Sequence, residues 1–442
     1  MATLRVKGGT VVTLGEASRV LPEHDVICRD DRVEAIRPTR EVQGAFDRTV
    51  EASGRVVMPG FINAHMHFYS TFARGLGKAQ PARDFDQVLR HLWWRLDKAL
   101  TLEDCYYSAL VPLIQAVRAG TTTLIDHHAS PRAVRGSLAR VAEAVDQTGV
   151  RACLCYEVSD RDGGGVAREG IEENAAWIEE VQRRGNPRLA GMFGLHASFT
   201  VGDETLDLAV AEARRLGAGF HLHVAEGPVD QRHALAFHER RVVDRLEKAG
   251  VLGPRTLLAH CIDVTPAEME TLARTRTAVV HNPQSNLNNA VGMADVAGMQ
   301  DRGVLVGLGT DGMTVRMGQE VRTALFVRHL REGNPSAGFL ETVALLLRHN
   351  AQIASRCFDV PVGVLAPGFA ADLAVLDYCP PTPLDDDSFP GHFVFGLAEA
   401  EVVTTICGGR VLMEDRRLLL DLDEAEVAAK ARECAAALWR RF

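Results

Sequence analysis

Hydrophobic and polar positions alternate differently in the middle of the chain and at its two ends. From residue 4 to about residue 57, short apolar runs alternate with polar positions between Gly, Asp and Arg turns. The same pattern returns after residue 357, around the turn Gly408–Gly409. Alternation with a period of two predicts β-strands, so we expect the two ends to build one small β-domain together.

Between about residues 58 and 356, eight short apolar runs alternate with longer stretches of helical periodicity, such as 104–119 and 205–216. This alternation favours parallel strands joined by helices, and eight repeats are the number that a closed (β/α)8 barrel requires. The predicted class is therefore α/β. The expected parts are a composite β-sandwich domain of residues 1–57 and 357–422, a TIM-type barrel of residues 58–356 and a C-terminal helix of residues 423–442.

Composition excludes several classes of protein. The 442 residues are 46% hydrophobic and 24% charged, which is ordinary for a globular chain. A net charge of -9 without a basic stripe argues against nucleic acid as a partner. No apolar stretch is long enough to cross a membrane, and nine irregularly spaced cysteines fit a reducing cytoplasm better than a disulfide framework. We expect a cytoplasmic protein that acts on a small molecule.

Side chains that can bind a metal stand at the ends of the apolar runs. His65 and His67 follow the first run two positions apart, so on an extended strand both imidazoles face one side and can reach one ion. His223 ends the fifth run, and Glu226 follows where it can face a water molecule without binding the metal. The last three runs end near His260, His281 and Asp311. In a barrel, the C-terminal ends of the strands form the active-site rim.

Six motifs together carry a family resemblance: "PGFINAHMHFYSTFARG", "GTTTLIDHHASP", "HLHVAE", "LLAHCID", "HNPQSNLNN" and "GLGTDGM". They resemble the amidohydrolase superfamily, within it the cytosine deaminase, guanine deaminase and triazine hydrolase branch, and most closely the SsnA-type aminohydrolases. The resemblance covers nearly the whole chain. It implies the metal ligands His65, His67, His223 and Asp311, with Glu226, His260 and Asp311 as catalytic residues.

The resemblance also implies one metal ion. Binuclear members of the superfamily bridge two ions with a carboxylated lysine of the fourth strand, but this chain has no lysine between Lys98 and Lys248. Lys248 itself lies in a helical pattern that ends at a glycine. We therefore expect one divalent ion per subunit. Zinc is the expected ion, and iron is the alternative that the same ligands would accept.

Substrate contacts are assigned to five residues, His196, His128, Glu157, Arg74 and His281. The family places a substrate-contacting histidine at the position of His196. For His128, which follows His127, a substrate contact and a structural role both stay open. Glu157 either binds a donor group of the substrate or pairs with an arginine, and Arg74 would grip a substrate carboxylate or carbonyl.

Three other aromatic side chains near these motifs have simpler expectations. Trp93 and Trp94 either line an apolar pocket or only pack in the interior. His221 lies one pleat deeper than His223 and is expected to be a core histidine.

The predicted activity is hydrolytic deamination of a small nitrogen heterocycle, such as a purine, pyrimidine or pterin, by a metal-activated water. Glu226 would shuttle the proton from water to the ring nitrogen. The alternatives at the same site are hydrolysis of a cyclic amide or imide and a chlorohydrolase-type displacement. A non-catalytic metal-binding protein is a remote alternative because every ligand and the general base are present. By analogy of fold, we expect a homo-oligomer, a dimer or larger.

Overall fold

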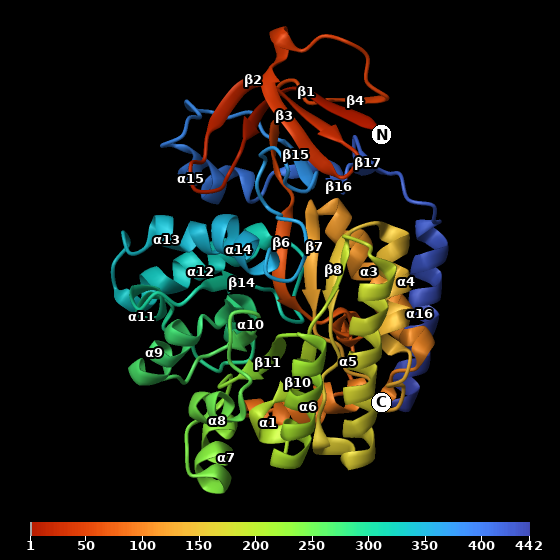
Figure 1. Ribbon diagram of the computed structural model, residues 1–442, viewed down its shortest axis with the longest axis vertical. Helices are drawn as coiled ribbons and strands as arrows, with labels where there is room; N and C mark the ends of the chain where they lie inside the picture. Colours follow the sequence, from red (N-terminus) through yellow and green to blue (C-terminus); the bar gives the residue numbers. More distant parts are fainter. Residues whose placement is uncertain (1) are drawn as a thin grey trace.

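The computed structural model describes residues 2–442 and shows a mixed α/β molecule in which the two ends of the chain meet (Figure 1). Nine strands from both ends form one hydrogen-bonded sheet, in the order β18-β17-β16-β15-β5-β1-β2-β3 with β4 beside β1. The N-terminal strands are β1 (Thr3–Val12), β2 (Val20–Arg29), β3 (Arg32–Pro38), β4 (Arg48–Glu51) and β5 (Val56–Pro59). The C-terminal strands are β15 (Leu373–Asp377), β16 (Glu401–Cys407), β17 (Arg410–Glu414) and β18 (Arg417–Leu418).

Strand β5 joins the two halves of this sheet. It runs parallel to β1 and antiparallel to β15. Apolar side chains from both ends, among them Val6, Val26, Leu373 and Ile406, pack in one buried cluster. Neither end could bury this surface without the other, because each contributes only part of the core.

The middle of the chain forms two parallel sheets. One contains β6 (Phe61–Met66), β7 (Thr121–Asp126), β8 (Arg151–Leu154) and β9 (Leu189–Gly191), and the other contains β10 (Phe193–Ala197), β11 (Phe220–Val224), β12 (Leu257–His260), β13 (Ala278–His281) and β14 (Val306–Leu308). Two parallel bridges join the sheets. One pairs Met66 of β6 with Asp311, just after β14, and the other pairs Val158, beyond β8, with Leu195 of β10.

Two of the eight apolar runs are each divided between two sheets. The first run changes sheet at Gly60, between β5 and β6, and the fourth at Met192, between β9 and β10. A Cβ atom on Gly60 would lie 2.3 Å from the side chain of Thr122, so the chain crosses there at a distance that only glycine permits. A hydrophobic pattern does not show such a change of partner.

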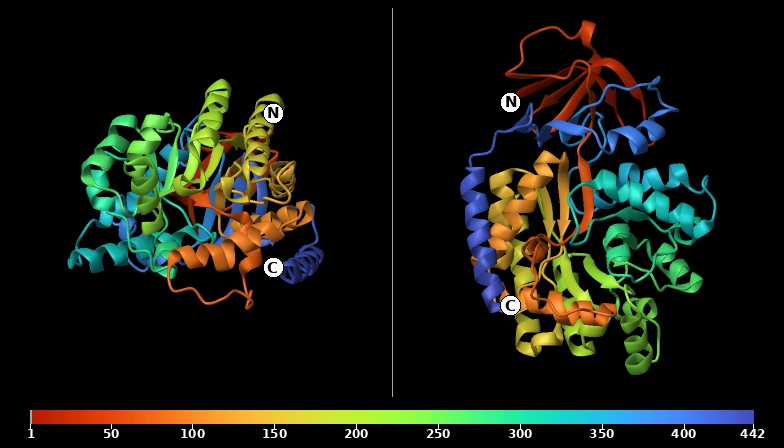
Figure 2. Two further views of the ribbon diagram at one scale, coloured as in Figure 1. Left: turned by 90° about the horizontal axis from the view of Figure 1, so that it is seen from below. Right: turned by 180° about the vertical axis from the view of Figure 1, so that it is seen from behind.

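Helices follow the parallel strands and cover them on the outside (Figures 1 and 2). The helices of this layer are α3 (Leu102–Arg118), α4 (Ser137–Thr148), α5 (Gly164–Arg184), α6 (Asp203–Leu216), α7 (Pro228–His238), α8 (Val242–Ala249), α9 (Pro266–Thr275), α10 (Pro283–Asn288), α11 (Val296–Asp301), α12 (Met317–Glu332), α13 (Phe339–Ala344) and α14 (Asn350–Ala354). Capping boxes begin α3, at Thr101 and Asp104, and α9, at Thr265 and Glu268.

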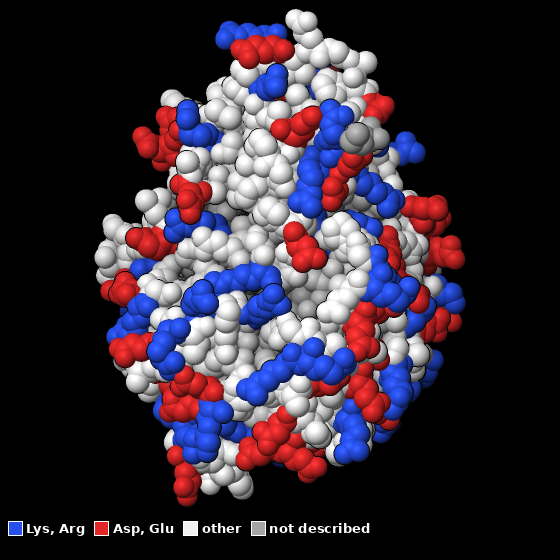
Figure 3. All heavy atoms as spheres, in the orientation of Figure 1, with Lys and Arg blue, Asp and Glu red and all other residues white. Residues whose placement is uncertain are grey.

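The remaining helices are α1 (Phe85–Val88), α2 (Trp94–Ala99), α15 (Phe389–His392) and the C-terminal α16 (Glu424–Arg441). Helix α16 lies beside α3, where Cys434 and Leu438 join the same buried cluster as Leu110 and Leu113. Within residues 2–442, no helix has both the length and the apolar character that a membrane span needs. Acidic and basic side chains are interspersed over the face that Figure 3 shows.

Candidate metal centre

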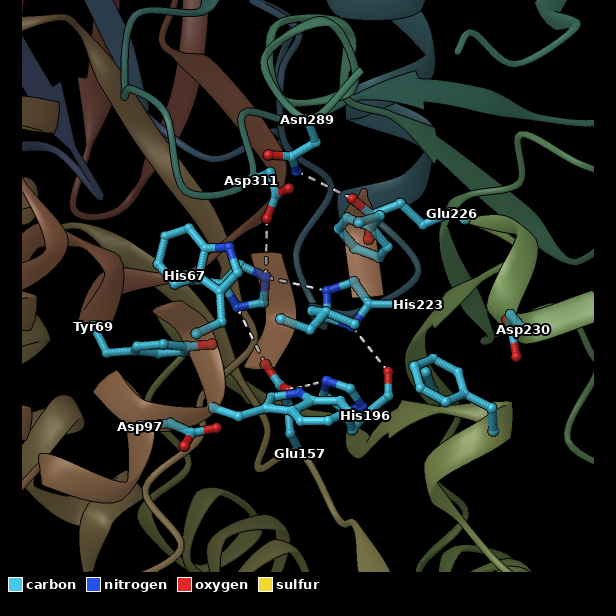
Figure 4. A pocket seen from close by; sticks show the side chains of 17 residues that line it. His67, Tyr69, Asp97, Glu157, His196, His223, Glu226, Asp230, Asn289 and Asp311 are labelled. Atoms are coloured by element: carbon cyan, nitrogen blue, oxygen red, sulfur yellow. Dashed lines mark hydrogen bonds and ion pairs between the residues drawn. The ribbon is translucent and has the colours of Figure 1, made fainter. Parts of the chain in front are cut away.

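Four imidazoles and one carboxylate meet where parallel strands end. Figure 4 shows His67, His223 and Asp311 of this cluster. They are His65 and His67 at the end of β6, His223 in β11, His260 in β12 and Asp311 directly after β14. The Nε2 atom of His67 lies 3.1 Å from Nε2 of His223 and 3.0 Å from Oδ1 of Asp311. Nε2 of His65 lies 3.7 Å from the same Asp311 oxygen.

The backbone at two of these residues is left-handed, which is uncommon outside glycine. The φ angle is 75° at His260 and 51° at Asp311. The amide of Asp311 donates to the carbonyl of His65 at 3.0 Å, which fixes this conformation beside β6. Unusual backbone angles of this kind concentrate at functional sites, where the surrounding structure holds them in place.

Each imidazole is oriented by a hydrogen bond of its other ring nitrogen. Nδ1 of His67 donates to the carbonyl of His127 at 2.6 Å, and Nδ1 of His223 donates to the carbonyl of His196 at 2.8 Å. Because a carbonyl only accepts, both rings carry their proton on Nδ1. Their Nε2 atoms therefore face the centre of the cluster.

The other two imidazoles have the same arrangement with side-chain partners. Nδ1 of His65 lies 2.9 Å from Nε2 of His221, and Nδ1 of His260 lies 2.9 Å from Oδ1 of Asn286. The Nε2 atoms of His65 and His260 are buried and have no hydrogen-bond partner among the described residues. They are therefore available to a bound ion or to a water molecule.

The spacing and chemistry of this cluster fit a divalent ion. Ligands around a tetrahedral zinc with bonds of about 2.0–2.1 Å are separated by about 3.3 Å. The separations of His67 from Asp311, His67 from His223 and His65 from Asp311 are 3.0, 3.1 and 3.7 Å. Imidazole and carboxylate ligands suit zinc. Lys248, the nearest following lysine in the sequence, lies on α8, which ends at Gly250, and so does not belong to the cluster.

The electrostatics of the site also favour a cation. Burial lowers the pKa of His65 to about 3 and that of His260 to about 4, so both rings are neutral. Burial alone would raise the pKa of Asp311, but the neighbouring His65 and His67 hold it well below its usual range. His67 responds in the opposite direction, because Asp311 and Glu157 outweigh burial and raise its pKa.

Glu226 stands beside this cluster, just beyond β11. Its Oε2 lies 3.4 Å from Nε2 of His260, and its Oε1 accepts a hydrogen bond from Nδ2 of Asn289 at 3.4 Å. Burial and the charge of Asp311 raise the pKa of Glu226 well above its usual value. A buried carboxyl group that faces a cleft can serve as a general acid–base residue, which takes up a proton and passes it on.

A pocket opens over the cluster. Its apolar wall is formed by Phe85, Leu89, Trp93, Trp94 and Phe199. Both tryptophans therefore line a pocket, which decides between the two alternatives that the sequence leaves open. A cleft with such an apolar, largely aromatic wall beside polar groups suits a flat organic molecule.

Two of the five assigned substrate contacts, His196 and Glu157, line this pocket. Oε1 of Glu157 lies 3.2 Å from Nδ1 of His67 and 3.5 Å from Nδ1 of His127, and Oε2 lies 3.8 Å from Nε2 of His196. Burial would raise the pKa of Glu157, but His67 lowers it to about 2. Glu157 is thus an ionised carboxylate among histidines, and within residues 2–442 it forms no ion pair with an arginine.

The other three assigned contacts lie outside the pocket. His128 is buried with Nε2 3.0 Å from Oγ of Ser130, and Arg74 is exposed. His281 faces a different cavity, between α11 and α12. Successive side chains of a strand point to opposite sides, so His281 and its neighbour Asn282 face different ways. Asn282 is the one that lies near His65, because a Cβ atom on Gly309 would contact both Asn282 and His65.

Several residues of the site have no assigned role in the sequence analysis. Asn286 and Asn289 lie in and after α10, in the motif "HNPQSNLNN", and touch His260 and Glu226; Ser285 donates to Asp311. His221 is buried as expected, but it also holds His65. The density of amide side chains in that motif is the signal that could have indicated the asparagines.

The site has histidines and an aspartate at the ends of parallel strands, with a buried carboxyl group beside them. This arrangement is typical of metal-dependent hydrolases. Residues 56–412 match the model of the Amidohydrolase family. The chain belongs to this family.

Individual relatives agree with this assignment. The chain is 32% identical, over the full length of both proteins, to a 5-methylthioadenosine/S-adenosylhomocysteine deaminase of Pelotomaculum thermopropionicum. It is 31% identical to a 5'-deoxyadenosine deaminase of Methanosarcina mazei, with 100% of this chain and 99% of the other covered.

Solved structures show the same fold. A zinc-bound adenosine deaminase of Xanthomonas campestris superposes with a TM-score of 0.87 at 24% identity, covering 99% of this chain and 98% of the other. The zinc-bound atrazine chlorohydrolase of Arthrobacter aurescens gives a TM-score of 0.83 at 20% identity, covering 98% of this chain and all of the other. At these identities the likeness concerns the fold.

Proposed function

We propose that this protein is a metal-dependent aminohydrolase that deaminates a small nitrogen heterocycle by hydrolysis. The observation that carries the proposal is the place of Glu226, a buried carboxyl group with a raised pKa 3.4 Å from His260 and beside the Nε2 cluster. This arrangement supplies a proton carrier next to a cation site. Relatives at 31–32% identity over the full chain are named deaminases, which supports the same reaction.

His65, His67, His223 and Asp311 would hold the ion, which we propose to be a single zinc. A bound zinc supplies a Lewis acid that makes water a stronger nucleophile at neutral pH. The Nε2 lone pair of His260, fixed by Asn286, accepts a hydrogen bond from the attacking water. His260 and Asp311 Oδ2, 3.9 Å apart, thereby orient the water toward the amino-bearing carbon.

Glu226 moves the proton. Its carboxylate takes a proton from water as the oxygen attacks the carbon, and its carboxyl form then gives that proton to the adjacent ring nitrogen. Asp311 assists the transfer of the second proton to the departing amino group, so that ammonia leaves and a carbonyl remains. Because burial raises the pKa of Glu226, the proton stays on this residue between the two transfers.

Substitution of Glu226 by Gln tests the proposal. Ammonia release should fall by a factor of about 10²–10⁴, while zinc content measured by mass spectrometry stays near that of the parent protein. His223→Ala and Asp311→Ala should lose the zinc as well. Glu239→Gln, at an exposed position after α7, is the matched control. Parent-like ammonia release from Glu226→Gln would exclude the proton-shuttle role.

The substrate panel should separate deamination from the other reactions of this fold. It includes 5'-deoxyadenosine, guanine, isocytosine, a pterin, a hydantoin and a chlorotriazine. Deamination releases ammonia, ring opening of the hydantoin releases none, and displacement on the triazine releases chloride. Chloride or a ring-opened acid without ammonia would favour the alternative reactions over the proposed one.

We further propose that the two parallel sheets form one closed (β/α)8 barrel spanning residues 58–356. The edge contacts at Met66 with Asp311 and at Val158 with Leu195 support closure. The shared sheet and core of residues 1–57 and 357–422 support a separate β-domain of the sandwich type, followed by the helix of residues 423–442. Homo-oligomerisation and a cytoplasmic location stay predictions.

A further inference from the structure

The candidate pocket has a second polar wall, which in Figure 4 lies across from Glu226 and Asn289 on the side of Tyr69 and Glu157. Trp94 and Asp97 of α2 form this wall and line the pocket. They are three positions apart on one helix, so their side chains project from the same face. The side chain of Asp97 is almost completely buried, with 2% exposure.

Arg161 holds this wall in place from behind. Its Nη2 donates to Oδ2 of Asp97 at 2.9 Å, and its guanidinium carbon lies 5.0 Å from the centre of the Trp94 ring. The guanidinium therefore neutralises the Asp97 carboxylate and stacks on the indole at the same time. A ligand of this wall needs no positive charge, because the aspartate already has its counterion.

Three polar atoms of the wall have no partner among residues 2–442. They are Oδ1 of Asp97, Nε1 of Trp94 and Nη1 of Arg161. Buried polar atoms almost always form hydrogen bonds, and a buried group without one costs stability. In this pocket-lining pair, Asp97 thus has an unpaired acceptor and Trp94 an unpaired donor, three residues apart on one helix.

We infer that Trp94 and Asp97 form a recognition subsite for a lactam edge, an N–H group next to a carbonyl, on the substrate ring. Oδ1 of Asp97 accepts the ring N–H, and Nε1 of Trp94 donates to the carbonyl oxygen. The substrate class is then an amino-substituted heterocycle that also carries an oxo group, bound as the free base. This inference rests on the proposed deamination.

The surroundings of the subsite favour a flat edge over a sugar. Both polar atoms are buried, and the neighbouring wall is aromatic, with Tyr69 and Trp93 in edge contact at a centroid distance of 6.5 Å. A ring edge lies in one plane and fits against such a wall. Sugar hydroxyl groups project out of that plane and need more room.

The test compares matched ligands on metal-loaded protein carrying Glu226→Gln, which binds without turnover. Guanine and 2-aminopurine differ only at the lactam edge, and isocytosine and 2-aminopyrimidine differ in the same way. Calorimetric titration gives the affinity ratio within each pair. We expect the lactam member of each pair to bind about 10- to 100-fold more tightly, the range for a hydrogen bond to a charged or buried group.

Trp94→Phe, added to this background, removes the indole N–H and retains an aromatic ring. It should reduce the affinity ratio within each pair by about tenfold, and Asp97→Asn should reduce it as well. Trp439→Phe is the matched control, because its indole donates to the carbonyl of Phe72 outside the pocket. Zinc content and thermal unfolding of each variant show that the fold is retained. Asp97→Asn leaves Arg161 without its charged partner and can prevent folding. In that case the result with Trp94→Phe decides.

Each outcome supports or overturns the subsite independently of the reaction. Equal affinity for both members of a pair, no binding of either lactam, or a ratio that Trp94→Phe leaves unchanged would overturn it. If Trp94→Phe weakens the binding of 5'-deoxyadenosine but not that of guanine, the wall contacts sugar hydroxyl groups and the lactam assignment is overturned. If the parent protein releases no ammonia but the ratios change as expected, the subsite stands and the proposed reaction fails.

Discussion

At the scale of single residues, His65 of the candidate metal centre is held by a chain of buried hydrogen bonds behind it. If His65 binds an ion through Nε2, its proton is on Nδ1 and is donated to Nε2 of His221 at 2.9 Å. His221 then carries its own proton on Nδ1, which faces Sγ of Cys155 at 3.6 Å, and that thiol donates to the carbonyl of Asp126 at 3.4 Å. Every donor in this chain has an acceptor only when His65 presents its lone pair to the site.

His221→Phe should weaken zinc binding about 10- to 100-fold, because it removes the acceptor that fixes His65 and retains the ring volume. Competition with a chelator measures the zinc affinity. His221→Gln should bind more tightly than His221→Phe, since an amide oxygen can accept the same hydrogen bond. His24→Phe in β2 is a control for loss of an imidazole away from the site. Equal zinc affinity in parent and His221→Phe would show that His221 only fills space.

At the scale of elements, β10 connects the two parallel sheets and carries His196 to the pocket. Gly194 permits this, because β10 passes directly against the backbone of Tyr156. A Cβ atom on Gly194 would lie 2.2 Å from the carbonyl oxygen of Tyr156. That oxygen is part of the main chain and cannot turn away as a side chain could.

Gly194→Ala should therefore destabilise the protein by about 1–3 kcal/mol or more, in the range of overpacked cores. Chemical unfolding measures the loss. Gly253→Ala serves as the control, since a Cβ atom there would have no neighbour within 4 Å and the residue has no positive φ angle. If both variants unfold at the same denaturant concentration, the close approach at Gly194 does not constrain β10.

At the scale of the whole molecule, one buried ion pair joins the parallel sheets to the nine-stranded sheet. Nε and Nη2 of Arg151 in β8 bond the two carboxylate oxygens of Asp372, just before β15, at 2.9 and 3.2 Å. The two side chains are 1% and 2% exposed. Asp372 also accepts the amide of Gly408 at 2.7 Å, so one carboxylate holds three segments together.

Asp372→Ala should cost about 3–5 kcal/mol of unfolding free energy, because it leaves the guanidinium of Arg151 buried without a counterion. Thermal and denaturant unfolding measure the effect. Asp377→Ala is the matched control on the neighbouring strand β15, where the pair with Arg416 is more than half exposed and should contribute little. A loss no larger than that of the control would show that the two sheets do not depend on this pair.

Much of this architecture could be read from short-range pattern. The stretches 104–119 and 205–216 correspond to α3 and α6, and the apolar runs contain the parallel strands. His65, His67, His223, His260 and Asp311 stand where runs end, and they do meet. The contacts of His281 and Arg74 were not predictable in this way, because they depend on which side of a strand or loop faces the pocket.

The sequence by itself determined the strand and helix pattern and the family, and it predicted the candidate ligands, since these follow from residue types at local spacings and from shared motifs. Only the tertiary structure decided which nitrogen of each imidazole faces the site, that His221 supports His65, and that Trp94, Asp97 and Arg161 share one wall. The physical reason is that hydrogen-bond partners, burial and pKa depend on atoms brought together from distant parts of the chain. Local pattern carries no record of those neighbours.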